Sequence, residues 1–216
     1  MDDSPHTRSD ERLYLSLVVG LLLLAATGGW FITHTLLKPD QTHVIAPDRA
    51  RMLPAFTLTN ATGTTVTRAD LNGKILVVSF LLTSCSLTCP VVTKHLAEIQ
   101  NLTAREPDVR LVSLTVDPRD DTVAGLAKYG AKYGADTNRW FFLTGEKDAL
   151  YNVISTSFLN QDLDDPFVYM PGNFSHTERV AVVDAHGRTQ AYFDGLRDDV
   201  AASVIAEIDR LRQQDK

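Results

Sequence analysis

The sequence predicts an α/β domain with a mixed central sheet covered by helices, preceded by one N-terminal transmembrane helix. Three observations support this prediction. Strand-like and helix-like hydrophobic patterns alternate from residue 54 onward. Two of the strand-like segments are nearly continuous apolar runs, which is typical of strands buried on both faces of a sheet. A stretch near the N-terminus that lacks charged residues is long enough to cross a lipid bilayer.

The stretch without charged residues runs from Leu13 to Leu37 and is 25 residues long. Because an α-helix rises about 1.5 Å per residue, roughly 20 residues span the ~30 Å hydrocarbon core of a bilayer. A cleaved signal peptide is the alternative. Against it, the tail before the stretch is acidic, and the small-residue cluster Ala25–Gly29 lies inside the stretch rather than after it. We therefore expect an uncleaved anchor.

The predicted organisation has four parts, namely an N-terminal tail (1–12), a transmembrane anchor (13–37), a tether (38–53) and one domain (54–216). The tether contains two prolines and mixed charges and has no sustained hydrophobic periodicity. The remainder is long enough for one well-packed domain and too short for two. Basic residues before and after the anchor are nearly balanced, so the positive-inside rule does not set the orientation.

The first half of the domain predicts a hairpin followed by a β-α-β unit. Phe56–Leu58 and Thr64–Val66 flank a turn, which predicts the hairpin. Ile75–Leu82 is an apolar, β-branched run that predicts a strand buried on both faces. Apolar residues recur at helical spacing over about Pro90–Arg105, and Val109–Val116 predicts a second buried strand.

The second half of the domain continues the alternation and ends in a β-β-α unit. The expected elements are a helix capped by Asp121-Thr122 that runs to about Tyr133, a strand over Trp140–Leu143, a helix from Glu146 to about Phe158, a hairpin formed by Arg179–Val183 and Thr189–Phe193, and a final helix capped by Asp198-Asp199. A β-α-β unit followed by a β-β-α unit builds a mixed sheet covered by helices, as in thioredoxin-like folds.

The composition excludes several classes of protein. Lys and Arg number 21 against 27 Asp and Glu, so the net charge is −6, and a nucleic-acid binder, which needs a basic surface, is not expected. Hydrophobic residues make up 44% of the chain and charged residues 22%, which argues against wholesale disorder. Two cysteines are too few for a disulfide-rich scaffold or a four-thiolate zinc site.

The two cysteines, Cys85 and Cys89, fall where the predicted strand Ile75–Leu82 ends and the next helix begins. Exposed amide groups and the helix dipole stabilise a thiolate at such a junction, and Pro90 suits the first helical turn. The four-residue spacing is compatible with a static disulfide, with a redox-active pair, and with two ligands of one metal ion. The position at a strand-to-helix turn favours the two functional interpretations.

His176 is a candidate third ligand, just ahead of the predicted strand Arg179–Val183. A single histidine is more often a surface or packed residue than a ligand. In thioredoxin-like folds, however, the loop before this hairpin lies beside the N-terminus of the first helix. An imidazole next to two thiolates suits copper, particularly Cu(I). Asp117 either orients His176 or shapes the turn with Pro118.

Three ordered motifs resemble those of one family. Phe80–Pro90, with the sequence FLLTSCSLTCP, resembles the F-x-Y-T-x-C-P-x-x-C-P signature of the Sco/SenC family of membrane-anchored copper chaperones. Val116–Thr122, with the sequence VDPRDDT, resembles the family's V-D-P-x-x-D-T segment. His176-Thr177 followed by Val182–Gly187 is similar to the segment that carries the family's metal-binding histidine.

The resemblance implies that Cys85, Cys89 and His176 bind copper, as Cu(I) or Cu(II), with Asp117 supporting the site. It also implies delivery of copper to the dinuclear copper site of cytochrome c oxidase subunit II, with a copper donor protein and a thiol reductant as further partners. The alternative is a membrane-anchored thiol-disulfide oxidoreductase, in which Cys85 and Cys89 are the redox-active pair that keeps the target's cysteines reduced. Only under this alternative is the protein an enzyme.

Three positions depart from the family pattern. Leu82 stands where the family usually has Tyr, Ser86 where a proline is common, and Asp120 where a basic residue is frequent. The three candidate ligands and the aspartate that supports them match the pattern, so we expect the copper site to be kept. Changes beside the cysteines bear on the redox potential or on partner docking.

The resemblance also implies a location. Domains of this family face the bacterial periplasm or the mitochondrial intermembrane space. The N-terminal tail lacks an Arg-rich, acid-poor transit sequence, which favours a bacterium. We therefore expect a single-pass protein of the bacterial inner membrane, with its C-terminal domain on the periplasmic, extracytoplasmic side and about the first dozen residues in the cytoplasm.

Overall fold

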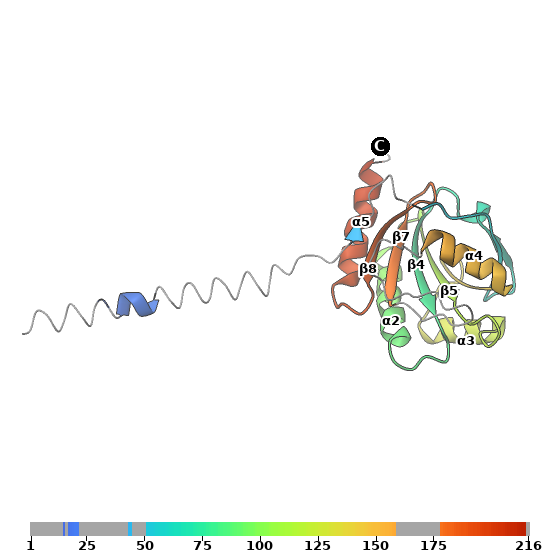
Figure 1. Ribbon diagram of the computed structural model, residues 1–216, viewed down its shortest axis with the longest axis horizontal. Helices are drawn as coiled ribbons and strands as arrows, with labels where there is room; N and C mark the ends of the chain where they lie inside the picture. Colours follow the sequence, from blue (N-terminus) through green and yellow to red (C-terminus); the bar gives the residue numbers. More distant parts are fainter. Residues whose placement is uncertain (1–14, 16, 22–42, 45–50, 159–177, 215–216) are drawn as a thin grey trace, which may run out of the picture. The chain divides into compact units, whose positions relative to one another are not determined.

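The computed structural model describes residues 15, 17–21, 43–44, 51–158 and 178–214 (Figure 1). The chain divides into two compact units, Met1–Asp40 and Gln41–Lys216. In the first unit, the described residues are helical. Across the described ranges, no helix is long and apolar enough to cross a membrane. Most of the predicted anchor over 13–37 lies outside these ranges, so the anchor stays a prediction.

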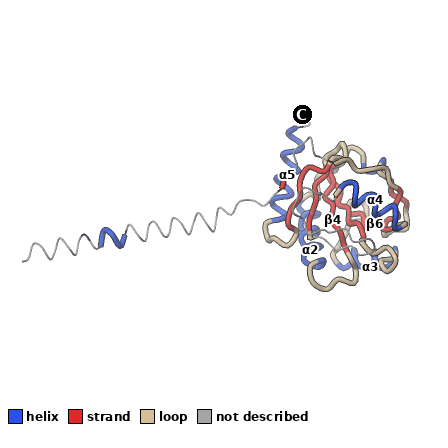
Figure 2. Tube along the Cα trace, in the orientation of Figure 1, coloured by secondary structure: helices blue, strands red, loops and turns tan. Residues whose placement is uncertain are grey.

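The second unit is built on a mixed sheet. Within the described residues, eight strands form this sheet in the order β1-β8-β7-β4-β5-β6-β2-β3. Figure 2 draws the strands in red, with β4 and β6 labelled. Their bounds are β1 His43–Val44, β2 Thr57–Asn60, β3 Thr65–Thr67, β4 Ile75–Leu81, β5 Val109–Thr115, β6 Trp140–Thr144, β7 Arg179–Val183 and β8 Thr189–Asp194. β4 pairs with β5, and β5 with β6, in parallel, whereas all other neighbours are antiparallel. The predicted mixed central sheet is therefore confirmed.

Helices cover both faces of the sheet. Their bounds are α2 Cys89–Leu102, α3 Val123–Lys132, α4 Lys147–Ser157 and α5 Val200–Gln214, with a short 3-10 helix, η1, at Ala69–Leu71. Apolar residues of α2, α3 and α5 pack on one face and those of α4 on the other, as Figure 1 shows for α2, α5 and α4. All seven residues of β4 are buried, with Val77 facing the α2 side and Val78 the α4 side. This confirms the predicted strand buried on both faces.

The N-terminal edge of the sheet includes residues that the sequence assigns to the tether. His43 and Val44 pair with Tyr192 and Ala191 of β8, and Met52 forms an isolated bridge to Arg188. The second compact unit begins at Gln41, and the predicted boundary between tether and domain at residue 54 stays a prediction. A two-residue strand is too short to show a hydrophobic period, so the sequence pattern cannot reveal it.

The start of α3 differs from the prediction. Thr122 is the N-cap residue, and its hydroxyl accepts a hydrogen bond from the backbone N–H of Gly125 at 3.1 Å. Asp121, predicted to share in the cap, is only 1% exposed and directs its carboxylate elsewhere. The sequence pattern does not show which of the two residues caps the helix, because Asp and Thr are both good capping residues.

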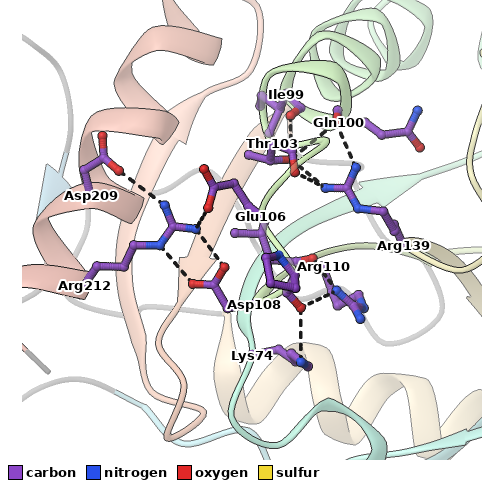
Figure 3. Close-up of polar contacts among 12 residues, drawn as sticks. Lys74, Ile99, Gln100, Thr103, Glu106, Asp108, Arg110, Arg139, Asp209 and Arg212 are labelled. Carbon is purple, nitrogen blue, oxygen red and sulfur yellow. Dashed lines mark hydrogen bonds and ion pairs between the residues drawn. The ribbon is translucent and has the colours of Figure 1, made fainter.

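Ion pairs hold α5 against the loop that precedes β5. Figure 3 shows the guanidinium of Arg212 between Glu106, Asp108 and Asp209, with N–O distances of 2.7, 2.8 and 3.4 Å. These side chains are partly exposed, so each pair contributes little stability by itself. β5 runs parallel to β4, so both strands begin at the same end of the sheet. The cluster at the start of β5 therefore lies at the opposite end from the residues that follow β4.

Candidate dithiol and metal site

Both cysteines lie where β4 passes into α2. We call residues 82–88 the cysteine loop; it carries Cys85 and leads into Cys89, the first residue of α2. The backbone N–H of Cys85 donates to the carbonyl of Leu82 at 3.0 Å, which makes a tight turn at the start of the loop. Pro90 occupies the first turn of α2, where its missing N–H costs no hydrogen bond. Leu87 is 79% exposed, so the loop between the thiols faces solvent.

Cys85 is the more accessible of two free thiols. Its partial burial would raise its pKa. This effect is outweighed by hydrogen bonds to the sulfur from the backbone N–H groups of Cys89, Leu87 and Thr88 and from the thiol of Cys89, so the pKa falls to about 6. The sulfur of Cys85 is therefore a thiolate at neutral pH.

Cys89 is 5% exposed, and its thiol has the opposite character. Burial is the main cause that raises the pKa of Cys89 to about 11, against a lowering hydrogen bond from the backbone N–H of Leu82. The hydrogen bond to Cys85 and the negative charges of Cys85 and Asp121 raise it further. The stabilisation of a thiolate expected at the start of the helix is thus found for Cys85 but not for Cys89, because burial outweighs it there.

Asp117 shapes the turn after β5. Its backbone N–H donates to the hydroxyl of Thr115 at 3.0 Å, and its carbonyl accepts from the N–H of Asp121 at 2.9 Å. Its carboxylate lies 3.9 Å from Nε of the exposed Arg119. His176 lies outside the described residues, so the predicted role of Asp117 toward it stays a prediction.

Asp121 is a buried polar residue whose role the sequence pattern did not reveal. Its carboxylate accepts hydrogen bonds from Thr83 at the start of the cysteine loop and from Thr115 at the end of β5. The sequence signal was an acidic residue directly before a helix, which the capping rule explains equally well. Asp121 thus belongs to the surroundings of the dithiol.

The arrangement provides two sulfurs of unequal acidity at one helix N-terminus. A thiolate and a neighbouring thiol can form or reduce a disulfide, and as thiolates they are soft ligands of the kind that select Cu(I). Among the described residues, no group of three or more His, Cys, Asp and Glu side chains is placed to hold a metal ion. His176 lies outside the described ranges, so its predicted part as a third ligand stays a prediction.

The fold and the paired thiols first define a class, a thioredoxin-like domain with a C-x-x-x-C dithiol at the first turn of a helix. The sequence profile of the SCO1/SenC family matches residues 45–213. The chain therefore belongs to the SCO1/SenC family.

Individual relatives agree with this assignment. The chain is 37% identical over 91 residues to the SCO1 protein homolog of Bacillus subtilis, a match that spans 42% of this chain and 47%, about half, of that relative. It is 24% identical over 189 residues to an SCO2-like protein of Rickettsia felis, across 83% of this chain and 89% of the relative.

Solved structures show the same fold. A SCO1/SenC family lipoprotein from Bacillus anthracis has a TM-score of 0.64 and 26% identity, across 77% of this chain and 99% of that one. BsSco, described as having a disulfide switch and as a member of the Sco family of cytochrome c oxidase assembly proteins, has a TM-score of 0.64 and 25% identity, across 76% and 94%. Bradyrhizobium japonicum ScoI, solved with copper bound, has a TM-score of 0.59 and 22% identity, across 74% and 99%, a likeness of fold.

Proposed function

We propose that this protein is a copper chaperone that binds copper through Cys85, Cys89 and His176 and delivers it to the dinuclear copper site of cytochrome c oxidase subunit II. The observation that carries the proposal is the pair of free thiols at the start of α2, one of them a thiolate at neutral pH. Copper bound to ScoI and the oxidase-assembly description of BsSco support it by relationship.

The two sulfurs take different parts in loading and release. Cys85 is accessible and already deprotonated, so it meets incoming copper first. Cys89 binds after its thiol loses a proton, which a bound cation favours. Release to an acceptor then proceeds by exchange of thiolate ligands, beginning at the exposed Cys85, so that no free copper leaves the site. A copper donor protein and a thiol reductant complete the cycle.

The proposed location is the bacterial inner membrane, with residues 13–37 as a single-pass anchor and the domain on the extracytoplasmic side. The B. anthracis family member is a lipoprotein, which supports attachment of such domains to a membrane. An anchor would hold the donor site near a membrane-bound oxidase. Resistance of the protein to carbonate extraction tests the anchor, and a processed N-terminus after Ala26 would contradict it.

A Cu(I) titration of the full chain against a competing chelator tests the copper site. The reduced protein is expected to bind one copper ion tightly, and the protein with a Cys85–Cys89 disulfide is expected to bind none, because a disulfide sulfur lacks the charge of a thiolate. His176→Ala is expected to weaken binding strongly. His186→Ala, which changes an exposed histidine in the β7–β8 turn, is the matched control. Tight equimolar binding by the oxidised protein would contradict the proposal.

A thiol-disulfide oxidoreductase is the second candidate, and the unequal acidity of the two thiols favours it. The Cys85 thiolate would attack a target disulfide and release one target thiolate. Cys89 would then lose its proton, attack the sulfur of Cys85 and release the second target thiolate, which leaves a Cys85–Cys89 disulfide for a thiol reductant to reduce. His176→Ala separates the two functions, since disulfide exchange would persist where copper affinity collapses.

A further inference from the structure

We propose that Asp121 is a positioning residue of the dithiol site. Its buried carboxylate holds the start of the cysteine loop against the end of β5, and this fixes how the sulfurs of Cys85 and Cys89 lie relative to each other. The part of the proposal that concerns copper rests on the proposed function. The part that concerns the disulfide depends on the same two sulfurs and needs no metal.

The contacts of Asp121 join two neighbouring strands at their ends. The backbone N–H of Thr83 donates to its Oδ1 at 3.2 Å, and the hydroxyl of Thr83 donates to the same oxygen. The hydroxyl of Thr115, which is fully buried, donates to Oδ2 at 2.5 Å. Thr83 follows β4 and Thr115 ends β5, so one carboxylate connects the cysteine loop to the adjacent strand.

A capping or space-filling role does not account for this carboxylate. α3 is capped by the hydroxyl of Thr122, so the helix does not need the charge of Asp121. Taking a carboxylate out of water costs several kcal/mol unless hydrogen bonds compensate. The donors described above are all neutral, and a hydrogen bond to an ionised acceptor is about twice as strong as one between neutral groups. The charge at this position therefore holds Thr83 and Thr115 more firmly than a neutral side chain would.

Thr83 transmits this restraint to the sulfurs. It lies two residues before Cys85, inside the turn closed by the hydrogen bond from the N–H of Cys85 to the carbonyl of Leu82. Cys89 is fixed independently, because it belongs to α2. The separation of the two sulfurs therefore depends on where the loop is anchored. A loop released from Asp121 would have to become ordered each time the two sulfurs bind one ion or form a disulfide. The entropy lost in this ordering weakens copper binding and destabilises the disulfide.

Two equilibria measured on the full chain test the proposal. The first is Cu(I) affinity by chelator competition, and the second is the equilibrium constant of the Cys85–Cys89 disulfide with glutathione, measured without metal. Asp121→Ala is expected to weaken each by about tenfold, the lower end of the effect of removing a group that supports metal ligands. Asp121→Asn keeps an acceptor oxygen for Thr83 but loses the charge, so its losses are expected to lie between wild type and those of Asp121→Ala. Asp120→Ala, an exposed neighbour, is the matched control and is expected to change neither.

Each result decides the question. A merely structural role would lower the melting temperature of Asp121→Ala and leave both equilibria of the folded protein unchanged, which overturns the proposal. Equal losses in Asp121→Asn and Asp121→Ala would show that the hydrogen bonds to an acceptor at this position play no part, which also overturns the proposal. If Asp121→Ala does not fold, Thr83→Val, which removes one donor, must shift both equilibria in the same direction or the proposal fails. If the wild type does not bind copper, the proposed function fails and the glutathione equilibrium alone decides.

Discussion

The reactivity of Cys85 toward an alkylating reagent is expected to follow a titration near pH 6. Only the thiolate reacts, so the rate reports the deprotonated fraction. With a pKa of about 6, Cys85 is about 90% thiolate at pH 7 and about 9% at pH 5, whereas an unperturbed thiol is only about 3% thiolate at pH 7. Cys89, with a pKa of about 11, has about 0.01% thiolate at pH 7.

The assay is the rate of iodoacetamide modification of the reduced protein from pH 4.5 to 9, with the modified residue located by mass spectrometry. The wild-type rate is expected to rise about tenfold from pH 5 to pH 7 and then to level off. Cys85→Ser, which leaves Cys89 as the only thiol, is expected to be nearly unreactive over the whole range. A midpoint above about pH 8 for Cys85, or modification of Cys89 before Cys85, would refute the assignment of the two thiols.

Three further predictions follow from the same structure. Copper affinity is expected to rise about tenfold per pH unit between pH 7 and pH 9, measured by chelator competition, because Cys89 is the one described thiol that must still lose a proton there; a flat profile would contradict this. Gly195→Ala is expected to cost about 1–3 kcal/mol in urea unfolding, because an added Cβ would lie 2.3 Å from the carbonyl oxygen of Glu178 and 3.1 Å from Val92; wild-type stability would show that the turn relaxes freely. Ile99→Ala is expected to lower the free energy of unfolding by about 2–5 kcal/mol, because it leaves a cavity under α2. Leu102→Ala changes a 58% exposed residue three positions along the same helix and is expected to lower it by less than about 0.5 kcal/mol. Similar losses for the two variants would contradict the assignment of the buried face.

The main elements of the fold could be predicted from the sequence because their signals are local. β4 is a nearly continuous apolar run, and the spacing of Val92, Leu96 and Ile99 marks the buried face of α2. The cysteines could be placed at the junction of these two elements for the same reason. Family membership was also accessible, because Phe80–Pro90 and Val116–Thr122 are short motifs that need no knowledge of contacts.

The acidity of the two thiols is different, because it depends on groups that only the folded chain brings together. Cys85 and Cys89 have nearly the same local sequence setting, at the start of one helix. Their surroundings in the folded chain differ. Hydrogen bonds from backbone N–H groups lower the pKa of Cys85, whereas burial away from water raises the pKa of Cys89.

The sequence by itself determined the main strands and helices, where the dithiol stands between them, and which family the chain belongs to, since these depend on residues that are close along the chain. The tertiary structure alone decided that Thr122 caps α3 while Asp121 turns inward. The donor Thr83 lies 38 residues away from Asp121 along the chain, and a local sequence pattern cannot predict a contact over that distance. It likewise decided that His43 and Val44 join the sheet, because their partners are in β8, far along the chain, and a strand gains its hydrogen bonds only from a neighbour that folding supplies.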